Sequence, residues 1–206
     1  MTKRINIFDF DGTIAESNIL KTEAFRYAAS DYGKEISEWF VNYHKENGGI
    51  TRQVKVETLC KKVNDAGAYG ELLTRYETYL EKEWLSCPLL AGFRAYIETL
   101  EGANVILSGG SKVEIEAYLK VNNLDQYFLE VYGNPTDKYV NLEAIEDRYL
   151  EKDSDVYFYG DSKLDFELSK QISAKFIFVS GVSEWEPSAL ELQEMKVRVE
   201  NFIKAQ

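Results

Sequence analysis

Cysteine and histidine are scarce in this sequence, which has two cysteines and one histidine among its 206 residues. Cys60 and Cys87 lie far apart without Cys-x-x-Cys spacing, so neither a disulfide framework nor a zinc knuckle is indicated. Long apolar runs are also absent, and no stretch approaches the length of a transmembrane helix. The chain passes from Met-Thr-Lys-Arg directly into an apolar segment, without the core of a signal peptide. We therefore expect a cytoplasmic protein that does not bind membranes.

Positive charge is in deficit. The sequence has 24 lysines and arginines against 35 aspartates and glutamates, which gives a formal net charge of −11 and a pI near 4.7. This balance argues against a nucleic-acid-binding surface and against a polybasic membrane patch. An anion could still bind, but the local positive potential would have to come from a metal ion, a few lysines and backbone N–H groups.

The remaining composition is ordinary for a globular protein, with 45% apolar and 29% charged residues. The length allows one good core with an insertion, or two small domains. No internal repeat and no low-complexity linker divides the chain.

A β-prone apolar segment at residues 5–8 leads directly into two aspartates, Asp9 and Asp11, followed by Gly12 and Thr13. β-branched and aromatic residues suit a buried strand, and Asp-Gly-Thr suits the turn that ends it. Open α/β sheets bind ligands at the carboxyl ends of their strands. If both carboxylates faced one pocket, their repulsion would favour a bound cation or a shared proton. An isolated pair could equally be an acidic turn.

The segment from residue 16 to residue 85 has helical spacing of its apolar residues. Helices are expected up to Gly33 and then over residues 35–45, 52–64 and 69–84. A mixed protein would usually show some strand over such a length. We interpret the segment as an all-helical unit inserted after the first strand.

From residue 86 onward strands and helices alternate. Strands are expected at 103–107, 127–132, 156–159 and 175–179, and helices at 89–101, 112–121, 142–150 and 164–172. A final helix is expected to bury Leu192, Met195, Val199 and Phe202 on one face. The alternation predicts an α/β fold with a doubly wound, parallel, Rossmann-like sheet. Residues 1–15 and 86–206 would form this core, and residues 16–85 the small helical domain.

Polar residues follow the strands of this expected sheet: Asp9 with Asp11, then Ser108, Lys138, and Asp161 with Asp165. In this order they resemble the four motifs of the haloacid dehalogenase superfamily, which read here FDFDGT, VILSGG, NPTDK and YFYGDSKLD. The resemblance covers the whole chain. The helical segment is similar to the cap placed between the first and second motifs in phosphoglycolate phosphatase and β-phosphoglucomutase-like members. Taken singly, Ser108 could cap a helix, Lys138 could be a solvated loop lysine and Asp161 could lie in a turn.

The resemblance implies phosphoryl transfer with Asp9 as the nucleophile that forms an aspartyl-phosphate. Asp11 would protonate the leaving alcohol and then take a proton from water. Mg²⁺ would be held by Asp9, Asp161 and the backbone carbonyl of Asp11, with Asp165 as an auxiliary ligand or a supporting group. Dehalogenases and phosphonatases of the superfamily generally lack an acid at the position of Asp11, so its presence favours phosphate monoesters.

The same resemblance gives roles to the other motif residues. Ser108 and the N–H group of Gly109 would hold phosphoryl oxygens, helped by the positive end of the helix that follows. Lys138 would pair with Asp9 and with the transferring phosphate. Gly12, in the first motif, is expected beside the substrate.

The helical cap is less informative. Arg52 follows a glycine-rich loop similar to one that carries a substrate-contacting arginine in β-phosphoglucomutase-like members, although it could simply begin a surface helix. Lys21 stands near the position where mutase-like members have a hinge histidine. His44 is expected to complement the dipole at the end of a cap helix.

The function expected from these residues is a Mg²⁺-dependent phosphatase of a small, soluble phosphate monoester, such as a sugar phosphate. One alternative is a phosphosugar mutase of the β-phosphoglucomutase kind, against which the residue at Lys21 argues. Another is a non-catalytic phosphate-binding protein on the same fold. The expected partner is a small phosphorylated molecule, and the expected oligomeric state is a monomer or a weak homodimer.

Overall fold

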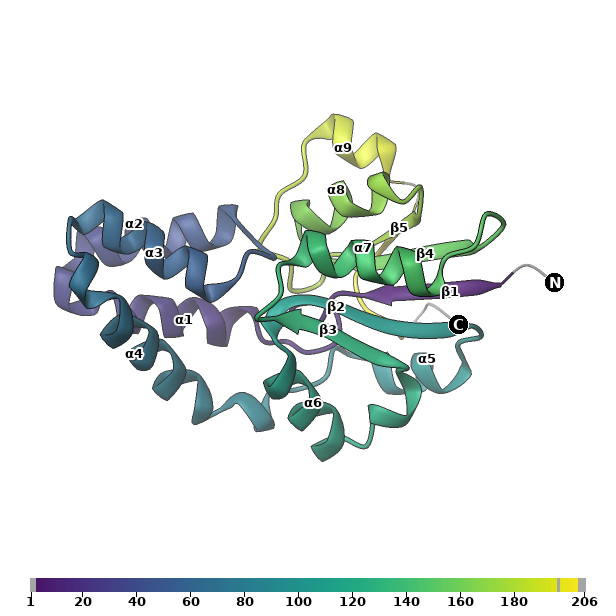
Figure 1. The fold of residues 1–206 in the computed structure, drawn as a ribbon, viewed down its shortest axis with the longest axis horizontal. Helices are drawn as coiled ribbons and strands as arrows, with labels where there is room; N and C mark the ends of the chain where they lie inside the picture. Colours follow the sequence, from purple (N-terminus) through teal and green to yellow (C-terminus); the bar gives the residue numbers. More distant parts are fainter. Residues whose placement is uncertain (1–2, 196, 204–206) are drawn as a thin grey trace.

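The computed structural model describes residues 3–195 and 197–203, and in these residues it contains one parallel sheet of six strands (Figure 1). The strand order is β3-β2-β1-β4-β5-β6. The expected α/β, Rossmann-like class is therefore confirmed. The strands are β1 (Arg4–Phe8), β2 (Ala103–Ser111), β3 (Glu130–Asn134), β4 (Asp155–Gly160), β5 (Lys175–Val179) and β6 (Val197–Val199).

Helices cover both faces of the sheet and one of its ends. The α-helices of the described chain are α1 (Asn18–Ala28), α2 (Lys34–Glu46), α3 (Arg52–Val63), α4 (Tyr69–Glu81), α5 (Phe93–Thr99), α6 (Lys112–Val121), α7 (Lys138–Tyr149), α8 (Lys163–Gln171) and α9 (Ala189–Glu194). Helices α5 and α6 lie on one face, α7 and α8 on the other, and α1 to α4 form a separate group at one end (Figure 1). Within the described residues, no helix combines the length and the apolar character needed to cross a membrane.

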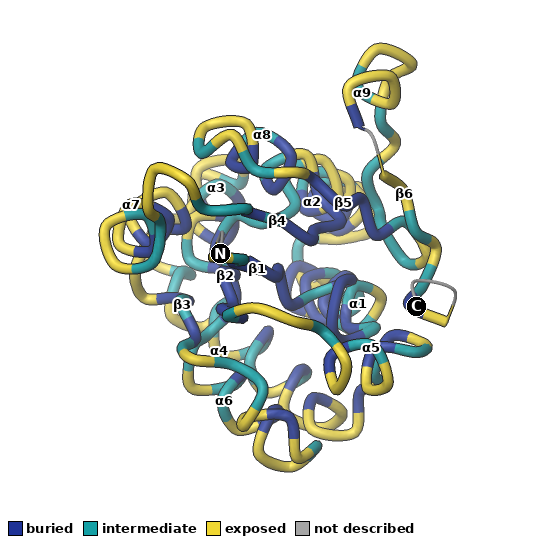
Figure 2. The backbone as a smooth tube through the Cα atoms, turned by 90° about the vertical axis from the view of Figure 1, so that its right-hand side faces the viewer, coloured by how far each residue is buried: buried dark blue, intermediate teal, exposed yellow. Residues whose placement is uncertain are grey.

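Strand β1 lies at the centre of the sheet and is buried on both sides, as Figure 2 shows. Ile5 and Ile7 belong to the apolar cluster under α7 and α8, whereas Phe8 faces the opposite cluster. The Phe8 ring stacks on Tyr159 of β4 with 4.2 Å between ring centroids. Burial on both faces explains why the strand is a nearly continuous apolar run, as is usual for parallel sheets.

Helices α1 to α4 form a separate helical group, referred to below as the cap, with α1 packed against α2 and α4. Two stretches of chain connect the cap to the sheet, and they pair with each other. The Glu16 N–H donates to the Pro88 carbonyl at 2.9 Å, and the Leu90 N–H donates to the Ile14 carbonyl at 2.9 Å. The cap is thus attached through one short hydrogen-bonded connection at the carboxyl end of β1.

Several element boundaries differ from the expected ones. Helix α7, expected from residue 142, begins at Lys138. Strand β2 continues to Ser111, through a glycine pair that β-propensity does not favour. Helix α5 begins at Phe93, because Leu89 forms a bridge with Ala15 and Gly92 has a φ of +80°. Strand β3 begins at Glu130, after a short 3₁₀ helix over Asp125–Tyr127.

The prediction of one amphipathic helix in the tail is wrong. Helix α9 ends at Glu194, and β6 then pairs with the edge of β5. Met195 joins the cluster under α7 and α8, whereas Phe202 joins the opposite cluster and packs against Phe93 and Tyr96. Because β6 carries the chain past the sheet edge, two residues assigned to one helical face lie on opposite faces of the sheet.

The path of the tail predicts that Phe202 contributes more to stability than Leu192 does. Phe202→Ala removes a side chain that is 1% exposed, and we expect it to lower the free energy of unfolding by about 3–5 kcal/mol. Leu192→Ala, at a position that is 39% exposed, should change it by less than about 0.5 kcal/mol. Urea denaturation of both variants provides the comparison, and equal losses would contradict the observed path of the tail.

Candidate active site

The turn after β1 separates the surroundings of Asp9 and Asp11. The Asp9 N–H still belongs to the sheet and donates to the Tyr159 carbonyl at 2.8 Å. The chain then turns sharply, with the Ile14 N–H donating to the Phe10 carbonyl at 2.8 Å. The two carboxyl groups therefore leave the same strand end but can have different neighbours.

Gly12 is required where the first motif meets the fourth. Its φ is +71°, a region that favours glycine. A β-carbon at this position would overlap the Asp161 carboxylate. Gly12 therefore permits a close approach between the two motifs rather than lining the cavity of the site.

Lys138 lies between two carboxylates at the start of α7. Its Nζ atom is 2.7 Å from Asp9 Oδ1 and 2.6 Å from Asp165 Oδ1, and the residue is 1% exposed. Asp137 caps α7 by accepting a hydrogen bond from the Tyr139 N–H at 2.8 Å, which fixes the helix start. The alternative of a solvated loop lysine is wrong. Lys138 fixes one oxygen of Asp9.

Asp161 and Asp165 follow β4 and have distinct partners. Asp165 Oδ2 accepts hydrogen bonds from the Ser162 N–H at 3.0 Å and from the Ser162 hydroxyl at 2.6 Å, completing a capping box on α8. Asp161 Oδ2 accepts one from the Asn18 amide at 2.7 Å. One oxygen from each of Asp9, Asp161 and Asp165 lies within 4.8 Å of the others. Both oxygens of Asp165 already accept hydrogen bonds, so it supports Lys138 and the α8 turn.

This crowding of buried carboxyl groups has an electrostatic cost. Burial raises the pKa of Asp161 well above its ordinary value, and the nearby Asp9 and Asp165 add to the effect. Burial also raises the pKa of Asp9 to about 7, although Lys138 opposes the shift. A divalent cation would stabilise the ionised forms, and an all-oxygen donor set of this kind fits Mg²⁺. The residues present are therefore suited to the metal.

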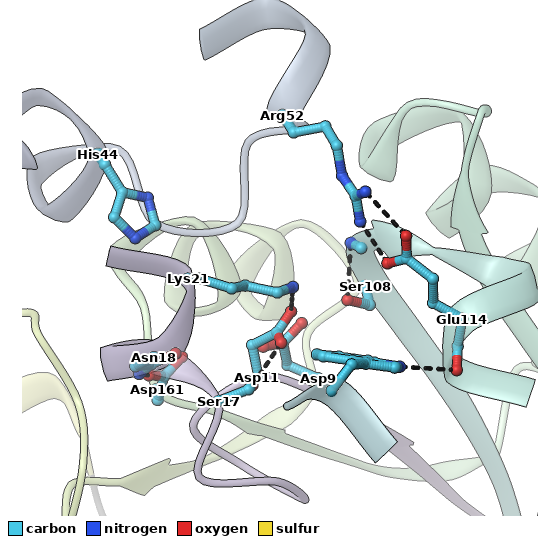
Figure 3. Close-up of polar contacts among 12 residues, drawn as sticks. Asp9, Asp11, Ser17, Asn18, Lys21, His44, Arg52, Ser108, Glu114 and Asp161 are labelled. Atoms are coloured by element: carbon cyan, nitrogen blue, oxygen red, sulfur yellow. Dashed lines mark hydrogen bonds and ion pairs between the residues drawn. The ribbon is translucent and has the colours of Figure 1, made fainter. Parts of the chain in front are cut away.

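Asp11 is held by residues of the cap side (Figure 3). Lys21 Nζ lies 2.5 Å from Asp11 Oδ2, and the Ser17 hydroxyl donates to Oδ1 at 2.5 Å. Burial alone would raise the pKa of Asp11, but these two partners outweigh it and lower the pKa. The pKa values of the two aspartates of the first motif thus shift in opposite directions.

Ser108 and Gly109 lie where β2 ends. Ser108 is fully buried, and its hydroxyl accepts a hydrogen bond from the Gly110 N–H at 2.9 Å. Ser111, not Ser108, caps α6. A β-carbon on Gly109 would overlap the carbonyl oxygen of Gly49 in the cap loop. Gly109 therefore allows the cap loop to lie directly on the second motif.

A cavity of about 70 Å³ lies between the sheet end and the cap. Asp9, Asp11, Gly109 and Asp161 line it from the core, whereas Lys21, Arg52 and Lys55 line it from the cap. Ser108, Lys138 and Asp165 are not among the lining residues and lie behind this surface. The structure thus brings together all four motifs that the sequence indicated, with three of the four carboxylates lining the cavity and with Asp165, Lys138 and Ser108 behind them.

Arg52 lines the cavity, but its guanidinium group already has partners. Nη1 lies 2.8 Å from Glu114 Oε1 of α6, Nη2 bonds Glu114 Oε2, and Glu77 is 3.4 Å away. Trp84 Nε1 donates to the Glu114 carbonyl at 3.0 Å. Arg52 therefore joins the cap to the core at Glu114 (Figure 3).

His44 does not act as the expected cation at a helix end. It is buried against the Phe25 ring, and burial with the nearby Lys55 charge lowers its pKa well below the ordinary value. Sequence analysis also missed the roles of Asn18, Lys55 and Glu114. Asn18 lies at the start of a helix and Glu114 in the first turn of another, where each has an ordinary structural explanation.

Comparison with known proteins identifies the family to which a chain with these motifs and this cap belongs. The family model described as haloacid dehalogenase-like hydrolase matches residues 6–179. The chain belongs to this family of hydrolases. A search of curated proteins finds no match.

Solved structures share the fold at low sequence identity. A candidate phosphoglycolate phosphatase from Lactobacillus plantarum has a TM-score of 0.75 and 18% identity, with 100% of this chain and 98% of that chain covered. A magnesium-bound candidate hydrolase of the family from Bacillus subtilis has a TM-score of 0.66 and 18% identity, covering 98% and 96%. A candidate β-phosphoglucomutase from Thermotoga maritima has a TM-score of 0.65 and 16% identity, covering 95% and 94%.

The crowding of buried carboxylates predicts that Asp161→Asn stabilises the metal-free protein but removes the stabilisation by Mg²⁺. In metal-free protein at pH 8, Asp161→Asn should raise the free energy of unfolding by on the order of 1 kcal/mol, because it removes a buried negative charge. The gain should shrink as the pH falls, because the wild-type protein then takes up a proton at its raised pKa. Excess Mg²⁺ should stabilise the wild type in thermal unfolding but not the variant. A destabilised metal-free variant would contradict the electrostatic account.

The Arg52–Glu114 contact predicts non-additive kinetics. We expect Arg52→Ala and Glu114→Ala each to lower kcat/KM, and the double variant to lose little more than either one, because both break the same contact. A steady-state double-mutant cycle measures this. If Arg52 instead contacts the substrate directly, Arg52→Ala will have the larger effect and the two losses will add.

Proposed function

We propose that the protein is a Mg²⁺-dependent phosphatase that hydrolyses a small phosphate monoester through an aspartyl-phosphate on Asp9. The observation that supports the proposal is that the neighbouring carboxylates of Asp9 and Asp11 have different partners. Lys138 binds Asp9 Oδ1, whereas Lys21 and Ser17 bind Asp11. A nucleophile and an acid–base group need this kind of difference.

In the first half-reaction, an oxygen of Asp9 would attack phosphorus. A bond from Asp9 to phosphorus forms, the ester bond to the alcohol oxygen breaks, and Asp11 supplies a proton to that oxygen. Lys138 fixes one Asp9 oxygen and contributes positive charge beside the attacking group. Ser108 and the glycine-rich end of β2 would position the phosphoryl oxygens.

In the second half-reaction, water would attack the aspartyl-phosphate. Asp11 would accept a proton from the water, and the bond between Asp9 and phosphorus would break to release inorganic phosphate. Lys21 favours the ionised form of Asp11, which is the form a general base requires. The proton taken up here restores Asp11 as an acid for the next cycle.

Asp9, Asp161 and the backbone carbonyl of Asp11 would hold Mg²⁺, with Asp165 supporting the set through Lys138 and Ser162. Bound Mg²⁺ would neutralise charge on the phosphoryl group during transfer. The cap would exclude bulk water, because its loop at Gly48 and Gly49 lies on the core at Gly109, Ser162 and Leu164. A small cavity under this loop favours a small substrate.

Substitution of the two aspartates tests the proposal. With Mg²⁺ and a panel of small phosphomonoesters, we expect Asp9→Asn to abolish phosphate release. Asp11→Asn should reduce it by about 10²- to 10⁴-fold, the usual contribution of general acid–base catalysis. Asp153→Asn, at an exposed position, is the matched control and should leave turnover unchanged.

Circular dichroism should show that all three variants fold. Absence of phosphate release from the wild-type protein across the panel would contradict the proposal. Interconversion of sugar-phosphate isomers without net release would instead select a mutase.

A further inference from the structure

The cationic side chains that line the cavity differ in whether a carboxylate lies close to them. Four of them have a carboxylate partner within 4.0 Å: Lys21 with Asp11, Lys45 with Glu184, Arg52 with Glu114 and Lys163 with Glu191. Lys55 also lines the cavity, but its ammonium group contacts His44, and no carboxylate of the described residues lies within 4.0 Å of it. The cavity thus contains one cation without a counter-ion among those residues.

Lys55 is deeply buried although no carboxylate pairs with it. The residue is 3% exposed, and its Nζ atom lies 2.7 Å from His44 Nδ1 and 3.4 Å from the His44 carbonyl oxygen. Burial lowers the pKa of Lys55 to about 7 and the charge of Lys21 adds to the effect, although the more distant Asp11, Glu184 and Asp161 oppose it. A buried ammonium group whose hydrogen-bond partners are both neutral is costly unless an anion comes into contact with it.

His44 supplies a second donor beside Lys55. A charged Lys55 ammonium group can only donate, so in the charged form it donates to Nδ1 and the neutral imidazole then carries its proton on Nε2. This Nε2 atom is buried and has no hydrogen-bond partner among the described residues. The nearest carboxylate oxygen, of Glu184, is 3.7 Å away, and Glu184 already pairs with Lys45 and accepts a hydrogen bond from the Thr22 hydroxyl. His44 lies on the cap side of the cavity, across from Asp161 (Figure 3).

The position of Lys55 in α3 explains why its ammonium group has no carboxylate partner. Arg52 precedes it by three residues, so the two side chains project from neighbouring positions on the helix. Glu114 and Glu77 engage Arg52, and no equivalent partner reaches Lys55. A water molecule could accept hydrogen bonds from Lys55 and His44, but it would leave the ammonium charge uncompensated.

We propose that Lys55 and His44 form a subsite for a second anionic group of the substrate, a carboxylate or a second phosphate, separate from the phosphoryl group transferred to Asp9. This inference rests on the proposed phosphatase function and narrows its substrate class. The core carboxylates and their metal would bind the reacting phosphate, and the cap would select esters that carry a further negative charge. Arg52, a candidate substrate contact from the sequence, instead holds the cap to the core.

Matched pairs of synthetic esters test the subsite. The carboxyalkyl compounds are phosphooxy-acetate, -propanoate and -butanoate, and each is compared with the hydroxyalkyl phosphate of equal length. Propane-1,3-diol bisphosphate tests phosphate as the second anion. In the wild type we expect kcat/KM for the best doubly anionic ester to exceed that of its hydroxyl counterpart by about 10- to 100-fold, the range of one charge-assisted hydrogen bond.

Lys55→Met keeps a side chain of similar length without charge and should reduce this ratio to about one, whatever the change in absolute rate. His44→Leu removes the neighbouring donor and should reduce the ratio in part. Lys61→Met, an exposed position on the same helix, is the matched control and should keep the wild-type ratio. Circular dichroism confirms that each variant folds.

Calorimetric binding of the same ester pairs to Asp9→Asn gives the ratio without any turnover. A preference for the anionic ester there supports the subsite even if the wild type releases no phosphate. Equal binding and equal turnover of the paired esters, or a ratio unchanged by Lys55→Met, would overturn the subsite while leaving the phosphatase proposal intact.

Discussion

The ion pairs of Lys138 with Asp9 and Asp165 are the interaction on which the site depends. Parallel strands end at one edge of the sheet, and here that edge collects several buried carboxyl groups. Without the ammonium group, Asp9 and Asp165 would be two unpaired buried charges, an arrangement proteins avoid. Lys138 is 1% exposed and bonds an oxygen of each. It therefore makes the crowding tolerable and sets the orientation of Asp9 at the same time.

Charge is divided between the two parts of the molecule. The core contributes Asp9, Asp11 and Asp161 to the cavity, and the cap contributes a set of cations. This division lets an overall acidic protein bind an anionic substrate, because the positive potential is local. It also means that the cap does more than exclude water. Lys21 fixes the charge of Asp11, and Arg52 joins the cap to α6.

The strand–helix order and the polar residues at the strand ends were predictable because they depend on local patterns. Strand β5 has the expected bounds, and Asp9, Lys138 and Asp161 lie close together. The contacts of Arg52 were not predictable, because Glu114 lies 62 residues away in another element. The prediction of a helical tail failed for a similar reason, since the pairing of β6 with β5 is a tertiary contact that overrides helical spacing.

The central claim, that Asp9 held by Lys138 is the nucleophile, can be tested by trapping the intermediate. Wild-type protein would be mixed with Mg²⁺ and a substrate from the phosphomonoester panel, quenched in acid within a single turnover, and analysed by peptide mass spectrometry. The account predicts a phosphoryl adduct on Asp9, absent from Asp9→Asn. Phosphate release with the adduct on another residue, or with no adduct at any quench time, would contradict it.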